Sequence, residues 1–257
     1  MAFNEQQIRR YSRHIQLPEI GEKGQQKIRK AKVLCIGLGG LGTVSSLYLA
    51  NAGVGKLGLA DFDKVDLNNI QRQILYKTED IGSFKTDAAK KSLFACNPDV
   101  DVVAFNEKLT EKNAERIINQ FDIIVDGTDN FSARYLINDT SVFLKKQLVF
   151  GAAMGFEGRA TTFSPEGPCY RCMHPEYDES LSVLDCAGAG IFSPIAGIIG
   201  LIQTSEALKL IVGKPDLIGR LLILNGRNMQ FTEYALKKNP KCGICGKKAL
   251  LDKVASL

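Results

Sequence analysis

Short apolar runs alternate with longer segments of mixed polarity through the first 151 residues of the chain. The apolar runs have the length of buried strands and lie at residues 32–36, 56–61, 100–105, 122–126 and 148–151. The segments between them predict helices at residues 41–52, 85–95, 110–119 and 131–145. Because strands alternate with helices, the pattern predicts a doubly wound, Rossmann-like α/β fold with a mostly parallel sheet.

The pattern changes after residue 152. Residues 159–163, 220–225 and 229–235 predict strands paired as in hairpins, so we expect antiparallel strands to extend the sheet. Residues 164–190 contain Gly and Pro and predict a long loop. At the other end of the chain, residues 3–11 and 25–30 predict two helices with polar faces.

The most apolar helix is expected at residues 194–212. Its unbroken apolar stretch covers only residues 195–202, far less than the roughly 18–20 residues that a membrane span needs. Ser193 suits the N-cap, Pro194 suits the first helical position and Gly213 suits the end of the helix. We therefore expect a buried helix and no membrane interaction.

A glycine-rich loop follows the first predicted strand. Gly37, Gly39 and Gly42, with Gly40 between them, form a GxGxxG motif that begins a helix. Such a loop turns tightly at the first glycine, admits phosphate at the second and allows close helix packing at the third. The free N–H groups of the helix start favour an anion. Asp61 ends the next strand, where a carboxylate can hold ribose hydroxyls, so the motif predicts a nucleotide site.

The loop alone does not decide which nucleotide binds. NAD is the first expectation, but hydride transfer also needs a proton relay, and neither of the two histidines, His14 and His174, lies in a recognisable catalytic setting. Residues 61–73 instead contain groups that suit a nucleoside triphosphate. Asn69 and Arg72 can reach its phosphates, and Lys85 adds a second cation at a helix start.

A further acidic segment, residues 126–130, ends the fourth predicted strand. A carboxylate at the C-terminal edge of a parallel sheet lies over the ligand crevice. Asp129 is therefore a candidate ligand for Mg²⁺, which binds carboxylate and phosphate oxygens. The alternative is that Asp129 caps the helix that follows.

The chain has seven cysteines, four of which form two CxxC pairs. Cys169 with Cys172, and Cys242 with Cys245, match the spacing of a tetrahedral zinc site built from four thiolates. A redox role would need only one such pair. We therefore predict a structural Zn²⁺ that joins the C-terminal region to the middle of the chain. Cys35 and Cys96 are expected to be packing residues.

The motifs together resemble one enzyme family. Residues 10–15, the glycine loop, residues 61–73, Lys85 and residues 126–130 resemble the adenylyltransferases that activate ubiquitin-like proteins, with ThiF, MoeB and HesA as nearest relatives. The resemblance runs from about residue 8 to residue 246. It implies a homodimer and one adenylyltransferase domain over residues 1–246, with a C-terminal tail at 247–257. Within this domain we expect a nucleotide-binding part at about 30–151 and a carrier-binding and zinc part at about 152–246.

The resemblance also assigns roles to residues. It implies that Arg13 reaches the ATP site of the partner subunit, and that Cys186 is the loop cysteine that carries sulfur in some members. The alternatives are a solvated surface charge for Arg13 and a spare thiol for Cys186. The catalytic residues expected on this basis are Arg13, Arg72, Lys85 and Asp129, with Cys186 as a candidate sulfur-transfer thiol. The expected nucleotide-binding residues are Gly37, Gly39, Gly40, Gly42, Asp61, Asp63, Asn69, Arg72, Lys85, Asp129 and Asn130.

The reaction that the resemblance implies is transfer of AMP to a carboxylate. The C-terminal glycine of a sulfur-carrier protein ending in Gly-Gly attacks the α-phosphate of ATP, and pyrophosphate leaves. A carboxylate is already ionised at neutral pH, so no general base is needed. The alternatives are a tRNA-modifying dehydratase of the same fold, an NAD-dependent oxidoreductase and a non-catalytic scaffold. Residues 10–15 and 72–81 lean towards the thiamin pathway, with the molybdopterin pathway as the rival.

Composition narrows the remaining classes of protein. Among 257 residues, 45% are hydrophobic and 24% are charged, which excludes disorder and collagen. The absence of Trp and the mild net charge of +5 argue against a nucleic-acid surface. The polar first ten residues show no secretory signal, so we expect a cytoplasmic protein. No rhodanese domain follows the second CxxC pair, so we expect a separate sulfur donor protein.

Overall fold

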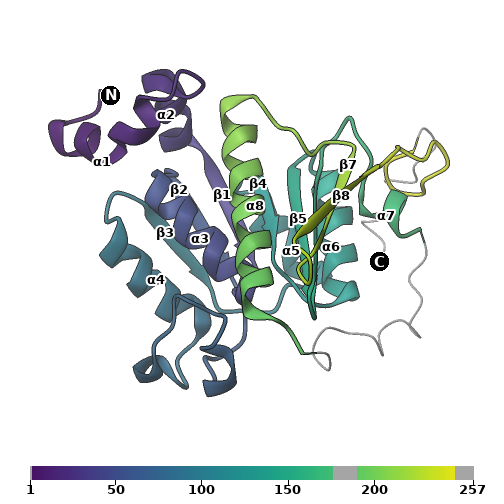
Figure 1. The fold of residues 1–257 in the computed structure, drawn as a ribbon, viewed down its shortest axis with the longest axis horizontal. Coiled ribbons are helices and arrows are strands. Elements are labelled where there is room, and N and C mark those ends of the chain that lie inside the picture. Colours follow the sequence, from purple (N-terminus) through teal and green to yellow (C-terminus); the bar gives the residue numbers. More distant parts are fainter. Residues whose placement is uncertain (1, 176–189, 247–257) are drawn as a thin grey trace.

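The computed structural model describes residues 2–175 and 190–246. These residues form one eight-stranded sheet with the order β3-β2-β1-β4-β5-β6-β7-β8 (Figure 1). The strands are β1 (Lys32–Ile36), β2 (Lys56–Ala60), β3 (Asp101–Phe105), β4 (Ile123–Asp126), β5 (Gln147–Met154), β6 (Glu157–Phe163), β7 (Arg220–Asn225) and β8 (Gln230–Ala235). The first five strands are parallel and the last three pair antiparallel, as the sequence predicts.

Helices cover both faces of the parallel strands. The α-helices of the described residues are α1 (Glu5–Ile15), α2 (Gly21–Lys30), α3 (Gly40–Ala52), α4 (Lys85–Cys96), α5 (Glu111–Ile118), α6 (Phe131–Phe143), α7 (Tyr170–Met173) and α8 (Ser193–Val212). Alternate residues of β1 point to opposite faces. Val33 and Cys35 pack with α3, α4 and α8, whereas Leu34 and Ile36 pack with α5 and α6. The doubly wound prediction is therefore confirmed.

Several local predictions differ from the structure. Helix α1 extends to Ile15 instead of ending at residue 11, and α2 begins at Gly21. Helix α7 lies inside the segment predicted as a loop, where the N–H of Tyr170 donates to Asn138 Oδ1 at 2.7 Å. This partner on a distant segment has no signal in the local sequence pattern. Cys96, the last residue of α4, is exposed, so the expected packing role is wrong.

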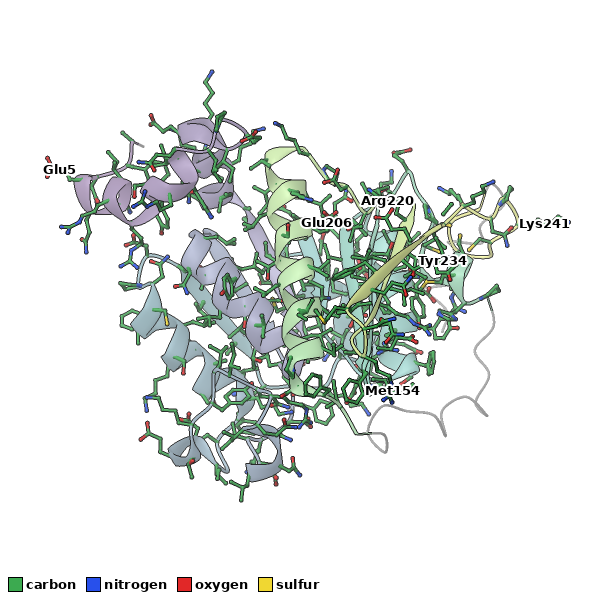
Figure 2. The ribbon with its side chains drawn as sticks, viewed as in Figure 1. Glu5, Met154, Glu206, Arg220, Tyr234 and Lys241 are labelled. Atoms are coloured by element: carbon green, nitrogen blue, oxygen red, sulfur yellow. The ribbon has the colours of Figure 1, made fainter. Side chains whose placement is uncertain are left out.

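The apolar helix α8 crosses one face of the sheet, beside α3 (Figure 1). By length and composition it is the one helix of the described residues that meets the requirements for a membrane span. It carries Glu206, which lies between the helix and the sheet (Figure 2) and accepts from the N–H of Leu217 at 2.8 Å. The helix begins at Ser193, so Phe192, and not Ser193, occupies the N-cap position. The N–H of Phe192 donates to Gly155 O at 2.9 Å, which fixes this start.

Candidate functional site

The glycine loop lies at the point where the sheet reverses its winding. Strands β1 and β4 are neighbours, but β1 leads into α3 on one face and β4 leads into α6 on the other. Loops that leave adjacent strand ends in opposite directions open a crevice at the C-terminal edge of the sheet. The structure therefore places the glycine loop at the usual ligand position of this fold class.

The glycines of the loop have different surroundings. Gly37 has a φ of 83°, which favours glycine. A Cβ on Gly42 would lie 1.9 Å from the carbonyl oxygen of Gly37, so the helix start packs directly on the turn. Among the described residues, a Cβ on Gly39 would meet only Gln73 Nε2 within 4 Å, at 3.9 Å. The backbone is thus close-packed at Gly42 and open at Gly39, where a phosphate can approach.

Asp61 ties the end of β2 to the glycine loop. Its carboxylate accepts from the N–H of Leu38 at 2.7 Å and from the N–H of Asp63 at 2.8 Å. Burial raises the pKa of Asp61, and the nearby Lys85 ammonium lowers it in part. Each carboxylate oxygen accepts one backbone N–H and can accept a second hydrogen bond, which fits a ribose-binding role.

Cationic and amide groups surround the same loop. Arg72 lies beside the start of α3, with its Cγ 3.5 Å from the position of a Cβ on Gly40. Its guanidinium donates to Asn68 O at 2.9 Å, and the side-chain amide of Asn69 contacts that of Asn68. Lys85 is 6% exposed. Its Nζ donates to Asp63 Oδ2 at 2.8 Å, so the structure pairs two predicted site residues with each other.

Asp129 lies on the turn after β4, next to the glycine loop. The backbone of this turn packs against the loop, because a Cβ on Gly127 would lie 2.8 Å from Gly37 O. Asn130, and not Asp129, caps α6: its Oδ1 accepts from the N–H of Ala133 at 2.9 Å. The capping alternative for Asp129 is therefore wrong, and its carboxylate is exposed, with Asn130 Nδ2 3.5 Å from its Oδ1.

Arg13 lies at the opposite end of α3 from the glycine loop. Helix α1 packs at the C-terminal end of α3, where a Cβ on Gly53 would lie 2.5 Å from Tyr11 Cζ. Helix α3 has 13 residues and is therefore roughly 20 Å long. The Arg13 guanidinium is exposed and contacts Gln16 Oε1 at 3.4 Å. Arg13 is not brought to the site of its own chain.

The four cysteines of the two CxxC pairs meet at one point. Their sulfur atoms all lie within 4.8 Å of one another, with Cys169 3.7 Å from Cys242 and Cys172 3.4 Å from Cys245. Four Zn–S bonds of about 2.3 Å in a tetrahedron require sulfur separations of roughly 3.8 Å, so the cluster fits zinc. Burial raises the pKa of Cys169 to about 12, so a cation is needed to hold that thiolate at neutral pH.

The knuckle that contains Cys169 and Cys172 is fastened to α6. Both guanidinium Nε and Nη2 of Arg171 donate to Asp139, the Nη2–Oδ2 distance being 2.7 Å. The guanidinium also lies over the ring of Tyr135, 4.6 Å from its centroid. The N–H of Asn239 donates to Cys172 Sγ at 3.3 Å, which brings the second knuckle onto the first. The cysteine cluster therefore joins the end of the described chain to the helix that follows Asp129.

A model of the ThiF family matches residues 11–244 of the chain. The chain belongs to the ThiF family. The match covers the glycine loop, the Asp61 to Gln73 segment, Lys85, Asp129 and three of the four CxxC cysteines, ending one residue before Cys245. The resemblance inferred from the motifs is thereby confirmed.

Relatives of this ThiF-family protein carry names of adenylyltransferases. It is 40% identical to the sulfur carrier protein adenylyltransferase of Thermus thermophilus, over 96% of this chain and 93% of that protein. It is 39% identical to the SAMP-activating enzyme E1 of Haloferax volcanii, over 96% of this chain and 92% of that protein. Against the adenylyltransferase and sulfurtransferase MOCS3 of Culex quinquefasciatus it is 42% identical, but spans 58% of that protein's length. The predicted class of enzyme, an adenylyltransferase, is confirmed.

Solved structures share the fold. The structure of Escherichia coli MccB with MccA-N7isoASN superposes with a TM-score of 0.83 and 22% identity, covering 93% of this chain and 75% of that chain. PaaA superposes with a TM-score of 0.78 and 26% identity, covering 93% of this chain and 76% of that chain. The mostly parallel sheet with antiparallel strands is therefore shared beyond the sequence relatives.

Two further residues of the ThiF-family site had no role assigned from the sequence. Asp126 is buried at the end of β4, and its carboxylate accepts from the N–H of Thr128 at 2.9 Å and from Thr128 Oγ1 at 2.7 Å. Gln73 lies beside Gly39. Both fall inside motif segments, but only their position in the folded chain shows what they contact. Cys186 lies outside the described residues.

Proposed function

We propose that this ThiF-family protein adenylates the C-terminal glycine of a small ubiquitin-like sulfur-carrier protein ending in Gly-Gly. The observation that carries the proposal is the meeting of three features at one crevice edge. These are the open backbone at Gly39, the cations Arg72 and Lys85, and the exposed carboxylate of Asp129. A triphosphate needs close backbone approach, positive charge and a cation ligand together.

In this proposal the protein accelerates the reaction by positioning the two reactants and by stabilising the negative charge that develops. A carboxylate oxygen of the carrier forms a bond to the α-phosphorus of ATP, and the bond to the bridging oxygen of pyrophosphate breaks. Negative charge grows on the phosphate oxygens, where Arg72 and Lys85 stabilise it. Asp129 holds Mg²⁺, which neutralises phosphate charge when bound. Asp61 holds the ribose, while its bond to the N–H of Leu38 keeps the loop in place.

We further infer a homodimer in which Arg13 of one subunit serves the site of its partner. The support is the location of Arg13 at the far end of α3, out of reach of the glycine loop of its own chain. Arg13 can therefore reach a nucleotide only at the site of another subunit. The single-domain organisation over residues 1–246 and a cytoplasmic location are part of the same proposal.

The carrier-binding part is proposed to lie on the antiparallel strands. Phe156 and Phe192 stack with ring centroids 4.8 Å apart, and the guanidinium of Arg227 lies 4.6 Å over Phe156. Met154 and Tyr234 are exposed on the same strand system (Figure 2). Exposed aromatic and Arg side chains of this kind are common at protein interfaces. Sulfur then comes from a separate donor protein, and Cys186 is the candidate thiol for its transfer.

The test is ATP–pyrophosphate exchange with purified carriers. We expect exchange with a carrier ending in Gly-Gly and none when the terminal glycine is removed, because the attacking carboxylate is then misplaced. Exchange that is absent with every carrier, or binding of NAD in place of MgATP, would overturn the proposal. Carriers of the thiamin and molybdopterin pathways should be compared directly. A relative in Porphyra purpurea is named a probable molybdopterin-synthase adenylyltransferase, whereas the lean towards thiamin stays a prediction.

A further inference from the structure

Gln73 is a buried glutamine whose side-chain amide is incompletely satisfied. The residue is 3% exposed, and its Oε1 has no hydrogen-bond partner in residues 2–175 and 190–246. Buried polar atoms without a partner are rare in proteins and call for an explanation. A phosphate oxygen cannot satisfy Oε1, which is itself an acceptor, but it can accept from Nε2 of the same amide. Among the described residues, Nε2 is the atom that a Cβ on Gly39 would meet within 4 Å.

The backbone on both sides of Gln73 holds this amide against the loop. The N–H of Gln73 donates to Asn69 O at 3.0 Å, and the N–H of Tyr76 donates to Gln73 O at 3.2 Å. The hydroxyl of Tyr76 in turn donates to Leu38 O at 2.9 Å, inside the glycine loop. The segment from Asn69 to Tyr76 is therefore hydrogen-bonded to the glycine loop. The side-chain amide of Gln73 lies beside Gly39, and the rest of the space around Gly39 is open.

A second buried glutamine provides a contrast. Gln203 is fully buried and also has an unpartnered Oε1. Its Nε2, however, donates to Asp126 O at 2.7 Å and to Val149 O at 3.2 Å. Gln203 therefore joins the last residue of β4 to Val149, the third residue of β5. The amide of Gln73 has no such pair of strand carbonyls, and it lies at the open part of the loop.

We propose that Gln73 is a further nucleotide-binding residue: its Nε2 donates to a phosphate oxygen of the nucleotide above Gly39. This inference rests on the proposed function, because it takes the loop to bind a nucleoside triphosphate. An amide donor orients the phosphate without adding charge, whereas Arg72 beside Gly40 supplies the charge. Gln73 thus determines where the phosphate lies on the loop.

The experiment measures the Kd of MgATP by calorimetry, with no carrier present, for the full chain and for Gln73→Met and Gln73→Glu. Met keeps the length of the side chain and removes both polar atoms. We expect Gln73→Met to raise the Kd of MgATP by about tenfold or more, as for loss of a hydrogen bond to a charged group. Gln73→Glu should raise it further, because a carboxylate then faces the phosphate. The Kd of adenosine should stay unchanged in both variants.

Ligand-free stability separates binding from folding. We expect the unfolding temperature of Gln73→Met to equal or exceed that of the wild type, since an unpartnered buried atom is removed. The matched variant Gln203→Met should lower it, because two strand carbonyls lose a donor. An unchanged Kd of MgATP in Gln73→Met, an equal loss for adenosine, or a lowered unfolding temperature would overturn the inference. If the wild type itself fails to bind MgATP, the proposed function fails with it.

Discussion

At the scale of single residues, Gly39 and Gly42 of one loop have opposite surroundings, and this predicts opposite effects of the same substitution. We expect Gly42→Ala to lower the free energy of unfolding by about 2–4 kcal/mol, because its Cβ would lie 1.9 Å from Gly37 O. Gly39→Ala should leave stability unchanged and weaken MgATP binding, because its Cβ enters the space open to phosphate. Denaturant unfolding and calorimetry measure the two effects. Equal stability losses in both variants would contradict this division.

Asp129 is exposed and does not cap α6, so its role can be tested without disturbing the fold. We expect Asp129→Ala to lower ATP–pyrophosphate exchange by at least about a hundredfold, because the proposed cation ligand is lost. The unfolding temperature should not change. Asn130→Ala is the matched control, since loss of the cap should lower stability by about 1 kcal/mol. Wild-type exchange in Asp129→Ala would rule out its proposed role.

Asp126 predicts a dependence of stability on pH. Burial raises its pKa in the folded protein above that of the unfolded chain. Its stabilising contribution is therefore complete below the unfolded pKa and is lost as pH rises through the folded pKa. We expect Asp126→Asn to be more stable than the wild type at neutral pH and to show less loss of stability between acidic and neutral pH.

Chemical unfolding across this pH range measures the difference. Asp216→Asn is the control of opposite sign, because hydrogen bonding to Lys209 lowers the pKa of Asp216. Its stabilising contribution is present above the unfolded pKa and is lost as pH falls. A wild-type pH profile in Asp126→Asn would show that this buried carboxylate does not titrate with folding.

At the scale of elements, the ion pair between Arg171 of α7 and Asp139 of α6 links the cysteine cluster to the helix that follows Asp129. The pair Arg171 and Asp139 is partly buried, with side-chain exposures of 28% and 16%. We expect Asp139→Asn to lower the free energy of unfolding by about 1–2 kcal/mol, because a partly buried guanidinium loses its charged partner. Zinc should also leave this variant faster when a chelator is added, as measured with a metal-sensitive dye.

The exposed pair Arg116 and Glu107, 2.7 Å apart, gives a matched control. Glu107→Gln should leave the rate of zinc release unchanged, since this pair is more exposed and lies away from the knuckles. Equal rates of zinc release from the wild type and Asp139→Asn would show that the ion pair between Arg171 and Asp139 does not stabilise the metal site.

At the scale of the whole molecule, Arg13 and Asp129 belong to different subunits of one proposed site. Arg13→Ala and Asp129→Ala should each be inactive as homodimers. A mixed dimer of the two variants has one intact site and one doubly defective site. After equal mixing and exchange of subunits, we expect about a quarter of wild-type activity, since half the dimers are mixed.

Pyrophosphate exchange before and after subunit mixing measures this recovery. If Arg13 and Asp129 acted at the same site of one chain, mixing would restore no activity, because every chain carries one of the two substitutions. An Arg13→Ala homodimer with wild-type exchange would show instead that Arg13 is a solvated surface charge.

The sequence by itself determined the alternating strands and helices, the glycine loop, the acidic strand ends and the two CxxC pairs. These features depend on local periodicity or on fixed spacing, and both can be recognised from residues that are close together in the sequence. The alternation was enough to predict a parallel sheet, because connections between parallel strands need a crossover helix. The motifs then gave the family.

Only the tertiary structure decided which of these groups meet. It assigned the α6 cap to Asn130, formed α7 against Asn138, placed Arg13 away from its own loop and set the amide of Gln73 beside Gly39. Each of these depends on contacts between segments that are distant in the chain. The local sequence pattern does not predict such contacts, because the hydrogen-bond partner of a buried side chain can come from any distant segment that packs against it.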